Sequence, residues 1–144
     1  MTLLDLGAKY FTWHDVTFSI NAARLRLDNT PDDETQATIL HTAKRMDVLR
    51  EKLGCAVDVS SWYRSPKVNA AIGSKPTSQH RLGCAVDFTA RKFGTNREVF
   101  AFLKDHMEEL GIDQLILEYA DHPNGGWIHV SFTDTPRHMA FVIN

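Results

Sequence analysis

The chain contains 144 residues, of which 43% are hydrophobic and 24% are charged, and its formal net charge is −2 with neutral histidines. This length suits a single domain with one hydrophobic core, and the composition excludes an extensively disordered chain. The near balance of charges disfavours a nucleic-acid-binding protein, which usually carries a basic domain or a clustered Lys/Arg face.

The chain shows no repeat, low-complexity tract or flexible linker, so we expect one domain over residues 1–144. Its first residues lack a basic segment followed by an apolar stretch of about 7 residues, and no later segment approaches the roughly 18 apolar residues of a membrane span. We therefore expect synthesis in the cytoplasm without a signal peptide and without a membrane span. Cys55 and Cys84 suit neither a disulfide framework nor a metal knuckle, so each is expected to be a small buried hydrophobe.

The first predicted helix covers residues 31–53. Thr30 can cap its free amides, a proline suits its first turn, and Gly54 is placed to end it. Apolar residues recur along it at spacings of three and four, which predicts that one face covers a core: Ile39, Ala43, Met46, Leu49 and Leu53.

A second helix is expected over residues 96–110. Thr95 and Glu98 can form a capping box at its start, and Gly111 can stop it. Segments rich in Val, Ile, Phe, Trp and Thr predict strands over residues 56–63, 84–90, 114–120, 127–133 and 138–143. This order of elements predicts an α+β fold, in which helices flank a mainly antiparallel sheet.

Polar side chains interrupt three of the predicted strands. Because side chains alternate across a sheet, Asp87 points away from the apolar residues on either side of it, and the same alternation separates His129 and Glu118 from their neighbours. Burying a charged carboxylate without a partner costs several kcal/mol, so Asp and Glu are seldom fully buried unless they are paired or bound to a metal. Three such residues in one small sheet indicate a functional site.

Taken singly, each residue has a simpler explanation. Asp87 could cap a turn, His129 could be a core histidine with satisfied hydrogen bonds, and Glu118 could lie on a solvated face. The segment 78–87 favours a joint site, because a loop histidine, His80, can fold back across Gly83 to meet Asp87. Imidazole and carboxylate groups are good zinc ligands, and three protein ligands that leave a fourth position for water are typical of catalytic zinc.

The pattern S-x-H-x-x-G-x-A-x-D over residues 78–87, followed by W-x-H at residues 127–129, resembles the zinc D-Ala-D-Ala peptidases. These enzymes share a fold with lysostaphin-type enzymes and the Hedgehog signalling domain. Residues 61–66, S-W-Y-R-S-P, together with Asn69, are similar to another segment of the family, and the resemblance covers about residues 24–132.

This resemblance implies roles for individual residues. The residues that match His80, Asp87 and His129 bind one zinc ion, and Arg64 matches an arginine that stabilises the oxyanion or grips the substrate. Many members carry an acidic residue three positions before the last histidine, where this chain has Gly126. In the branch with a closer likeness, the glutamate that matches Glu118 is the expected base. Asp121 is the reserve candidate for the base, and substrate binding is assigned to Ser78, Gln79 and Trp127. His122 lies in the turn-rich segment 121–126; it could line the cleft and help to hold the substrate or intermediate, or it could be a plain loop histidine.

The expected function is therefore a monomeric zinc peptidase that cuts an amide in the peptide stem or cross-link of bacterial peptidoglycan, between D-amino acids or between L-Ala and D-Glu. A murein hydrolase without a signal peptide suits a phage lysis enzyme released by a holin, or an enzyme carried in a virion. One alternative is a D-Ala-D-Ala carboxypeptidase or dipeptidase that acts on small precursors. The other is a catalytically silent, zinc-stabilised module that binds the cell wall.

Overall fold

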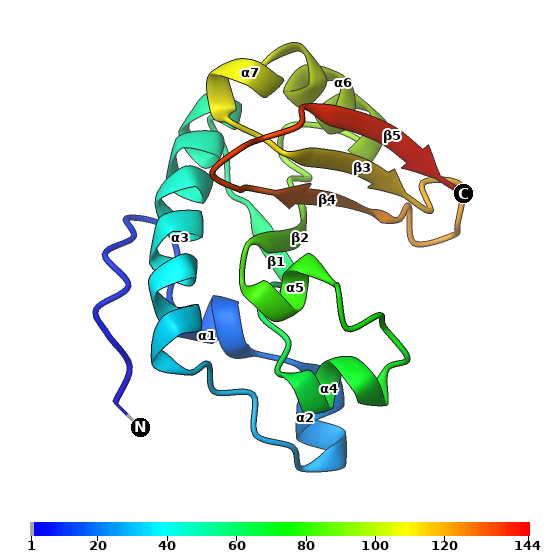
Figure 1. Cartoon of the computed structure of the whole chain (residues 1–144). Helices are drawn as coiled ribbons and strands as arrows, with labels where there is room; N and C mark the ends of the chain where they lie inside the picture. The colour runs from blue at the N-terminus through cyan, green and yellow to red at the C-terminus, as the bar shows by residue number, and fades with distance from the viewer. Residues whose placement is uncertain (1) are drawn as a thin grey trace.

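The computed structural model describes residues 2–144 and has the predicted α+β architecture (Figure 1). Five strands form one sheet in the order β1-β2-β4-β3-β5. All neighbouring pairs are antiparallel except β3 and β5, which are parallel. Each strand lies inside the range predicted for it: β1 Asp58–Ser61, β2 Ala85–Thr89, β3 Gln114–Glu118, β4 Trp127–Ser131 and β5 Met139–Ile143.

The helices differ from the prediction in their bounds and in their number. They are α1 Trp13–Thr17, α2 Ile20–Leu25, α3 Asp33–Leu53, α4 Pro66–Ala71, α5 Gln79–Leu82, α6 Asn96–Asp105 and α7 Met107–Leu110. The helix predicted over residues 96–110 is divided into α6 and α7, because His106 has a φ of −115° and a ψ of 18°. The sequence did not predict α1, α2, α4 and α5, since helices of 4 to 6 residues are too short to show a hydrophobic period.

The predicted start of the long helix α3 was wrong: the helix begins at Asp33 and not at residue 31. Its N-cap is Asp32 rather than Thr30, and the carboxylate of Asp32 accepts a hydrogen bond of 2.8 Å from the amide of Thr35. An aspartate caps at least as well as a threonine, and its charge complements the helix dipole. Gly54 ends α3 in the left-handed conformation, as predicted.

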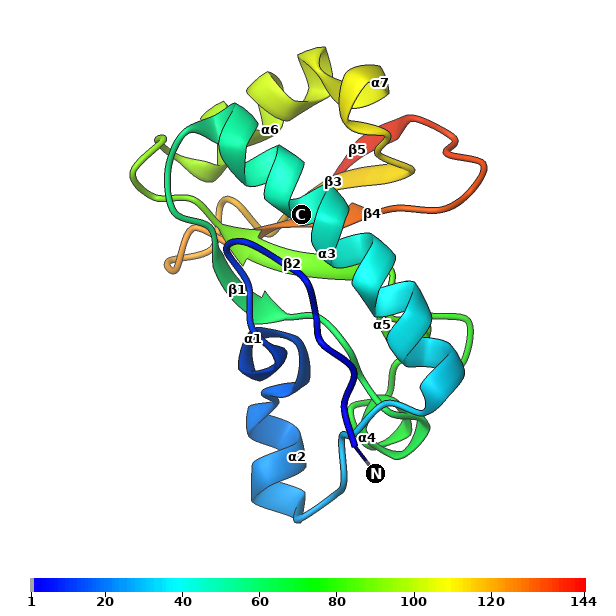
Figure 2. The same cartoon turned by 90° about the vertical axis from the view of Figure 1, so that its left-hand side faces the viewer.

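The hydrophobic core lies between α3, α6 and α7 and one face of the sheet (Figure 2). The apolar residues predicted for α3 are all buried in it, together with Leu103 of α6 and Leu110 of α7. The sheet contributes alternate residues that are each at most 2% exposed: Val86, Phe88, Leu115, Leu117, Ile128 and Val130. The residues between them therefore point to the opposite side of the sheet.

The two cysteines are free thiols with different burial. Cys84 is buried as predicted, and burial raises the pKa of its thiol to about 11. Cys55, which was also expected to be buried, is only half-buried, because it follows the end of α3 at the edge of the core. No helix within residues 2–144 is both long enough and apolar enough to cross a membrane.

Candidate metal centre

Three neighbouring strands gather polar residues on the side of the sheet away from the core. Asp87 on β2 lies directly opposite His129 on β4, and His129 lies opposite Ile116 on β3. Two residues farther along the same face, Glu118 lies opposite Trp127. The strand register therefore brings Asp87, His129 and Glu118 together, although they are distant in the sequence.

His80 is delivered by α5, which is a single helical turn where the sequence predicted a loop. Ser78 caps this turn, and its hydroxyl accepts a hydrogen bond of 3.3 Å from the amide of His80. Gly83 ends the turn with a φ of 81°, and a Cβ atom at this position would lie 2.6 Å from Cγ1 of Ile39 on α3. A glycine therefore allows both the left-handed conformation and the close packing of this turn against α3.

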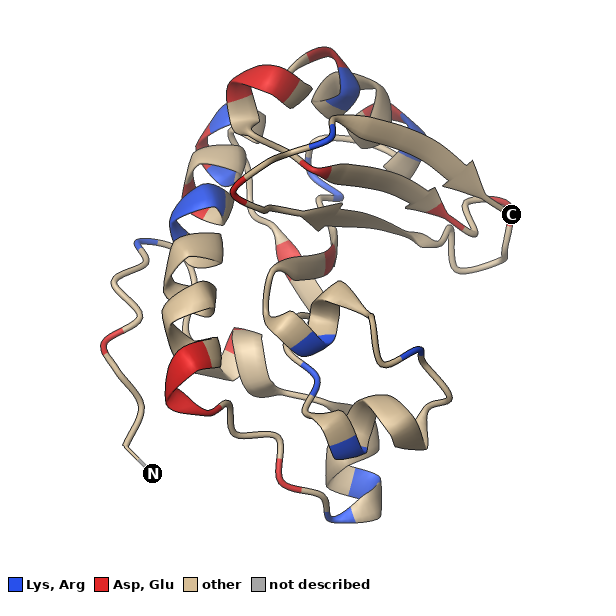
Figure 3. Ribbon diagram, viewed as in Figure 1, with Lys and Arg blue, Asp and Glu red and all other residues tan. Residues whose placement is uncertain are grey.

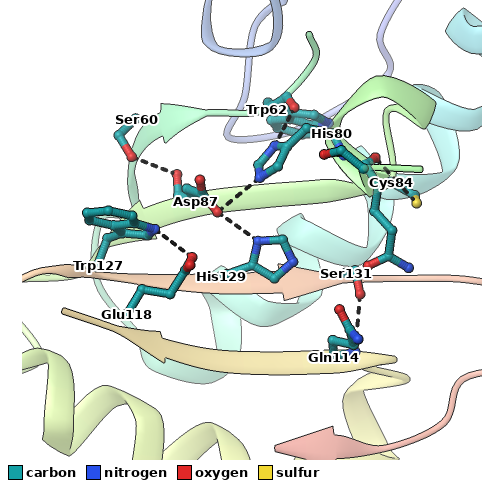
Figure 4. Close-up of polar contacts among 12 residues, drawn as sticks. Ser60, Trp62, His80, Cys84, Asp87, Gln114, Glu118, Trp127, His129 and Ser131 are labelled. Carbon is teal, nitrogen blue, oxygen red and sulfur yellow. Dashed lines mark hydrogen bonds and ion pairs between the residues drawn. The ribbon is translucent and has the colours of Figure 1, made fainter. Parts of the chain in front are cut away.

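The three predicted metal ligands meet around one carboxylate oxygen (Figure 4). Nε2 of His80 lies 3.1 Å from Oδ1 of Asp87, and Nδ1 of His129 lies 2.9 Å from the same oxygen. Each residue offers a ligand atom, and these atoms all lie within 4.8 Å of one another. The side chains are 4%, 14% and 11% exposed for His80, Asp87 and His129, so water competes little for the cluster.

The main chain fixes the orientation of His80. Nδ1 of the ring lies 2.7 Å from the carbonyl oxygen of Trp62, which can only accept a hydrogen bond, so Nδ1 carries the proton. In the neutral ring, Nε2 then presents a lone pair to the carboxylate of Asp87. A lone pair on Nε2 and a carboxylate oxygen 3.1 Å away repel each other unless a positive charge lies between them. A proton on Nε2 or a metal ion bound by both atoms would supply that charge. Such a backbone partner on the far nitrogen is typical of histidines that bind metals.

Asp87 is suited to act as an anionic ligand. Burial by itself raises the pKa of its carboxyl, but the neighbouring His80 and His129 outweigh this effect and hold the pKa below its ordinary value. The carboxylate is therefore ionised at neutral pH. Two imidazoles and one carboxylate are the donor set that zinc accepts in catalytic sites, so the residues present fit this metal.

Glu118 lies beside the cluster and is half-buried. Its Oε2 accepts a hydrogen bond of 2.8 Å from the indole N–H of Trp127, which orients the carboxylate (Figure 4). Burial and the negative charge of Asp87 raise the pKa of Glu118 above its ordinary value. A carboxylate with a raised pKa is suited to accept a proton and release it again.

Arg64 lies in the segment between β1 and α4 and is half-buried. Asn29 anchors this segment, because its side chain accepts a hydrogen bond of 2.7 Å from the amide of Ser65 and donates one of 3.0 Å to the carbonyl of Tyr63. Burial lowers the pKa of the Arg64 guanidinium, and the charges of Asp87 and Glu118 oppose this effect. Its Nε atom is buried and has no hydrogen-bond acceptor among residues 2–144, and the side chain lines the cavity described below.

A cavity of about 900 Å³ joins these groups. The three predicted ligands, Arg64 and Glu118 line it, together with Ser78, Gln79 and Trp127 of the predicted substrate-binding residues. Arg137 and Tyr119 also line the cavity, and the sequence reasoning did not single them out. Neither residue belongs to a motif, so no local signal marked it.

Two predicted residues lie outside the lining of this cavity. Asp121, the reserve base, is 72% exposed and pairs with the guanidinium of Arg97 at the start of α6. His122 is exposed, and its ring packs against that of Tyr119 at a centroid distance of 4.9 Å. The structure therefore brings Glu118 to the cluster and places Asp121 at the surface.

Gly126 occupies the position, three residues before His129, at which the resemblance led us to look for an acidic residue. Its φ is 69°, and a Cβ atom there would lie 1.9 Å from the carbonyl oxygen of Glu118 and 2.5 Å from the carbonyl carbon of Tyr119. No side chain fits at this position in the present backbone. The carboxylate beside the cluster is instead that of Glu118, on the neighbouring strand β3.

Replacing Gly126 with alanine should destabilise the protein strongly. The left-handed conformation costs a residue with a side chain roughly 1–2 kcal/mol, and moving the backbone of β3 away from the new methyl group adds to this cost. Gly125→Ala is the matched control, because its φ is 79° but its Cβ atom would meet only Nδ2 of Asn96 at 4.0 Å. Urea unfolding should give a larger loss of unfolding free energy for Gly126→Ala, and equal losses would refute the steric argument.

Comparison with known proteins gives a consistent result. A family model described as Peptidase M15 matches residues 9–131 of the chain. This range begins before residue 24, where the motif-based resemblance begins, and it ends just after His129. A search of curated proteins gave no match.

Proposed function

Because the chain belongs to the Peptidase M15 family, a family of zinc D-Ala-D-Ala peptidases, we propose that it is a zinc-dependent peptidase that hydrolyses an amide in bacterial peptidoglycan. One observation carries this proposal: His80, Asp87 and His129 converge in the same cavity that holds Glu118 and Arg64. A purely structural metal site would be closed by a fourth protein ligand and would need neither an adjacent carboxylate nor an unpaired guanidinium nitrogen.

His80, Asp87 and His129 would hold one zinc ion, which supplies Lewis acidity that polarises an amide carbonyl and eases the deprotonation of water. Glu118 accepts a proton from the attacking water, whose oxygen forms a bond to the carbonyl carbon. The carbon–nitrogen bond then breaks, and Glu118 returns the proton to the leaving amine. Arg64 offsets the negative charge on the carbonyl oxygen while the carbon is tetrahedral. Trp127 keeps the Glu118 carboxylate pointed at the cluster throughout.

The substrate we propose is a stem or cross-link peptide of peptidoglycan, cut between D-amino acids or between L-Ala and D-Glu. In this proposal the protein acts as a monomer in phage lysis, released by a holin, or as part of a virion. Nucleic acid is not a proposed partner, because the formal net charge is −2; in the view of Figure 3, acidic and basic residues are mixed along α3, whereas α2, α4 and α5 carry basic residues only. The cavity of about 900 Å³ has room for a peptide substrate.

Digestion of purified peptidoglycan, followed by mass spectrometry, tests this proposal. An endopeptidase should release fragments with new amino and carboxyl termini inside the stem or cross-link, and these termini identify the bond. Release of free D-alanine alone would indicate the carboxypeptidase alternative. A zinc-loaded protein that binds peptidoglycan without releasing any product would indicate the silent binding module and contradict the proposal.

A further inference from the structure

A second polar cluster borders the same cavity on the side of the metal ligands away from Glu118, and it contributes Gln79 and Arg137 to the lining. Its centre is Asp113, which immediately precedes β3 and whose side chain is 1% exposed. Arg137 donates to this carboxylate from Nε at 2.9 Å and from Nη2 at 2.8 Å, and its backbone amide donates at 2.9 Å. Gln79 and Ser131 donate to Oδ2 of Asp113 at 3.1 Å and 3.3 Å. Asp113 is therefore fully engaged, and it holds the guanidinium of Arg137 in one orientation.

The guanidinium of Arg137 still has donors to offer. Its side chain is 54% exposed although it is fixed by Asp113, and it lines the cavity. Among the residues that the structure describes, none accepts a hydrogen bond from Nη1. A guanidinium that is oriented in advance loses little side-chain entropy when it binds a carboxylate, and its planar fork matches the geometry of that group.

Gln79 adds an acceptor to the same end of the cavity. Its amide nitrogen is engaged by Asp113, which fixes the direction of the side chain. Its Oε1 atom is buried, and no donor within residues 2–144 reaches it. Because a buried polar atom without a partner is costly, this oxygen is suited to accept a hydrogen bond from an N–H group of a ligand.

The strand register sets the distance between this cluster and the metal ligands. Ser131 lies two residues from His129 on β4 and on the same face, which corresponds to about 7 Å along the strand. Asp87, His129 and Ile116 lie side by side across β2, β4 and β3. Glu118 lies two residues beyond Ile116 on β3, in the direction away from Ser131. An extended peptide advances roughly 3.5 Å per residue, so a substrate at the metal site would reach the Arg137 cluster about two residues from the bond that is cut.

We propose that Arg137 and Gln79 form a specificity subsite that binds a carboxylate of the peptide, and an adjacent N–H group, about two residues from the scissile amide. This inference rests on the proposed peptidase function, because it assigns the orientation of the substrate in that site. Arg137 binds the carboxylate through the donors that Asp113 leaves free, and Asp113 acts as a positioning residue behind it. The alternative is that Arg137 only fastens residues 132–138 to the start of β3.

The test compares stem peptides that the protein cleaves with versions in which each carboxylate in turn is converted to a carboxamide. The wild type should prefer the free carboxylate at one position by about 10- to 100-fold in kcat/KM, mainly through KM, as expected for a hydrogen bond to a charged group. Arg137→Gln should lose this preference at that position and keep those at other positions. Lys52→Gln, which removes an ion pair with Glu109 outside the cavity, should behave as the wild type.

A double variant controls for destabilisation of the fold by the loss of Arg137. Arg137→Gln leaves Asp113 buried without its guanidinium, whereas the double variant Asp113→Asn, Arg137→Gln removes both charges together. The double variant should show the same loss of carboxylate preference and an unchanged zinc content. An equal loss of activity on carboxylate and carboxamide peptides, or a wild type without any preference, would overturn the inference. If the wild type cleaves none of the peptides, the proposed function itself fails, so the two failures can be told apart.

Discussion

Asp87→Ala should reduce the zinc content of the purified protein from about one ion per chain to near zero, and peptidase activity should fall to background. Asp87 is the only carboxylate among the three predicted ligands, and Oδ1 of Asp87 is the atom that both histidines approach. Without it, the two imidazoles keep no anionic partner, and the charge of a divalent ion would remain largely uncompensated in a buried site. Elemental analysis of the protein after dialysis measures the zinc content directly.

Thermal unfolding gives a second measurement of the same loss. A metal that binds only the folded chain raises the melting temperature, so excess zinc should stabilise the wild type and have little effect on Asp87→Ala. His106→Ala is a suitable control. His106 lies between α6 and α7, forms a hydrogen bond with Glu109 of α7, and is outside the cavity. The control should retain its zinc and its stabilisation. Full zinc content in Asp87→Ala would show that the ion, if present, binds elsewhere.

The sequence predicted the strands of the site well, because their alternation is a local property. Asp87 and His129 were each assigned to the face opposite their apolar neighbours, and the register places them side by side. The pairing itself could not be read from either strand alone. It depends on β2 and β4 being neighbours in the sheet, although α6, α7 and β3 lie between them in the sequence.

The sequence did not predict the pairing of Arg137 with Asp113, because this contact joins distant parts of the chain. β5 pairs parallel to β3 on the far side from β4, so residues 132–138 must cross the start of β3, beside Gln114. This crossing brings Arg137 to Asp113, and no short motif marks it. The choice between Glu118 and Asp121 was open for a similar reason. Asp121 lies at the surface, where its carboxylate pairs with Arg97, 24 residues away in the sequence.

Glu118→Gln should lower kcat by at least about 100-fold while the zinc content stays unchanged, because a positioned acid or base contributes roughly 10²–10⁴-fold. The amide of glutamine keeps the size of the side chain but cannot accept the proton of water or return it to the leaving amine. Glu118 is not among the three predicted ligands, so metal binding and catalysis should separate in this variant. Initial rates on the cleaved stem peptide, together with elemental analysis, measure both properties.

Asp121→Asn is the matched variant, since it changes a carboxylate to an amide in the connection between β3 and β4 without reaching the cavity. The carboxylate of Asp121 is exposed and paired with Arg97, so its loss should cost at most about 1 kcal/mol of stability and leave kcat near that of the wild type. The reverse result, with a large loss in Asp121→Asn and little in Glu118→Gln, would move the base to Asp121. It would also require the connection to fold over the cavity when substrate binds, because Gly126 leaves no room for a carboxylate of its own.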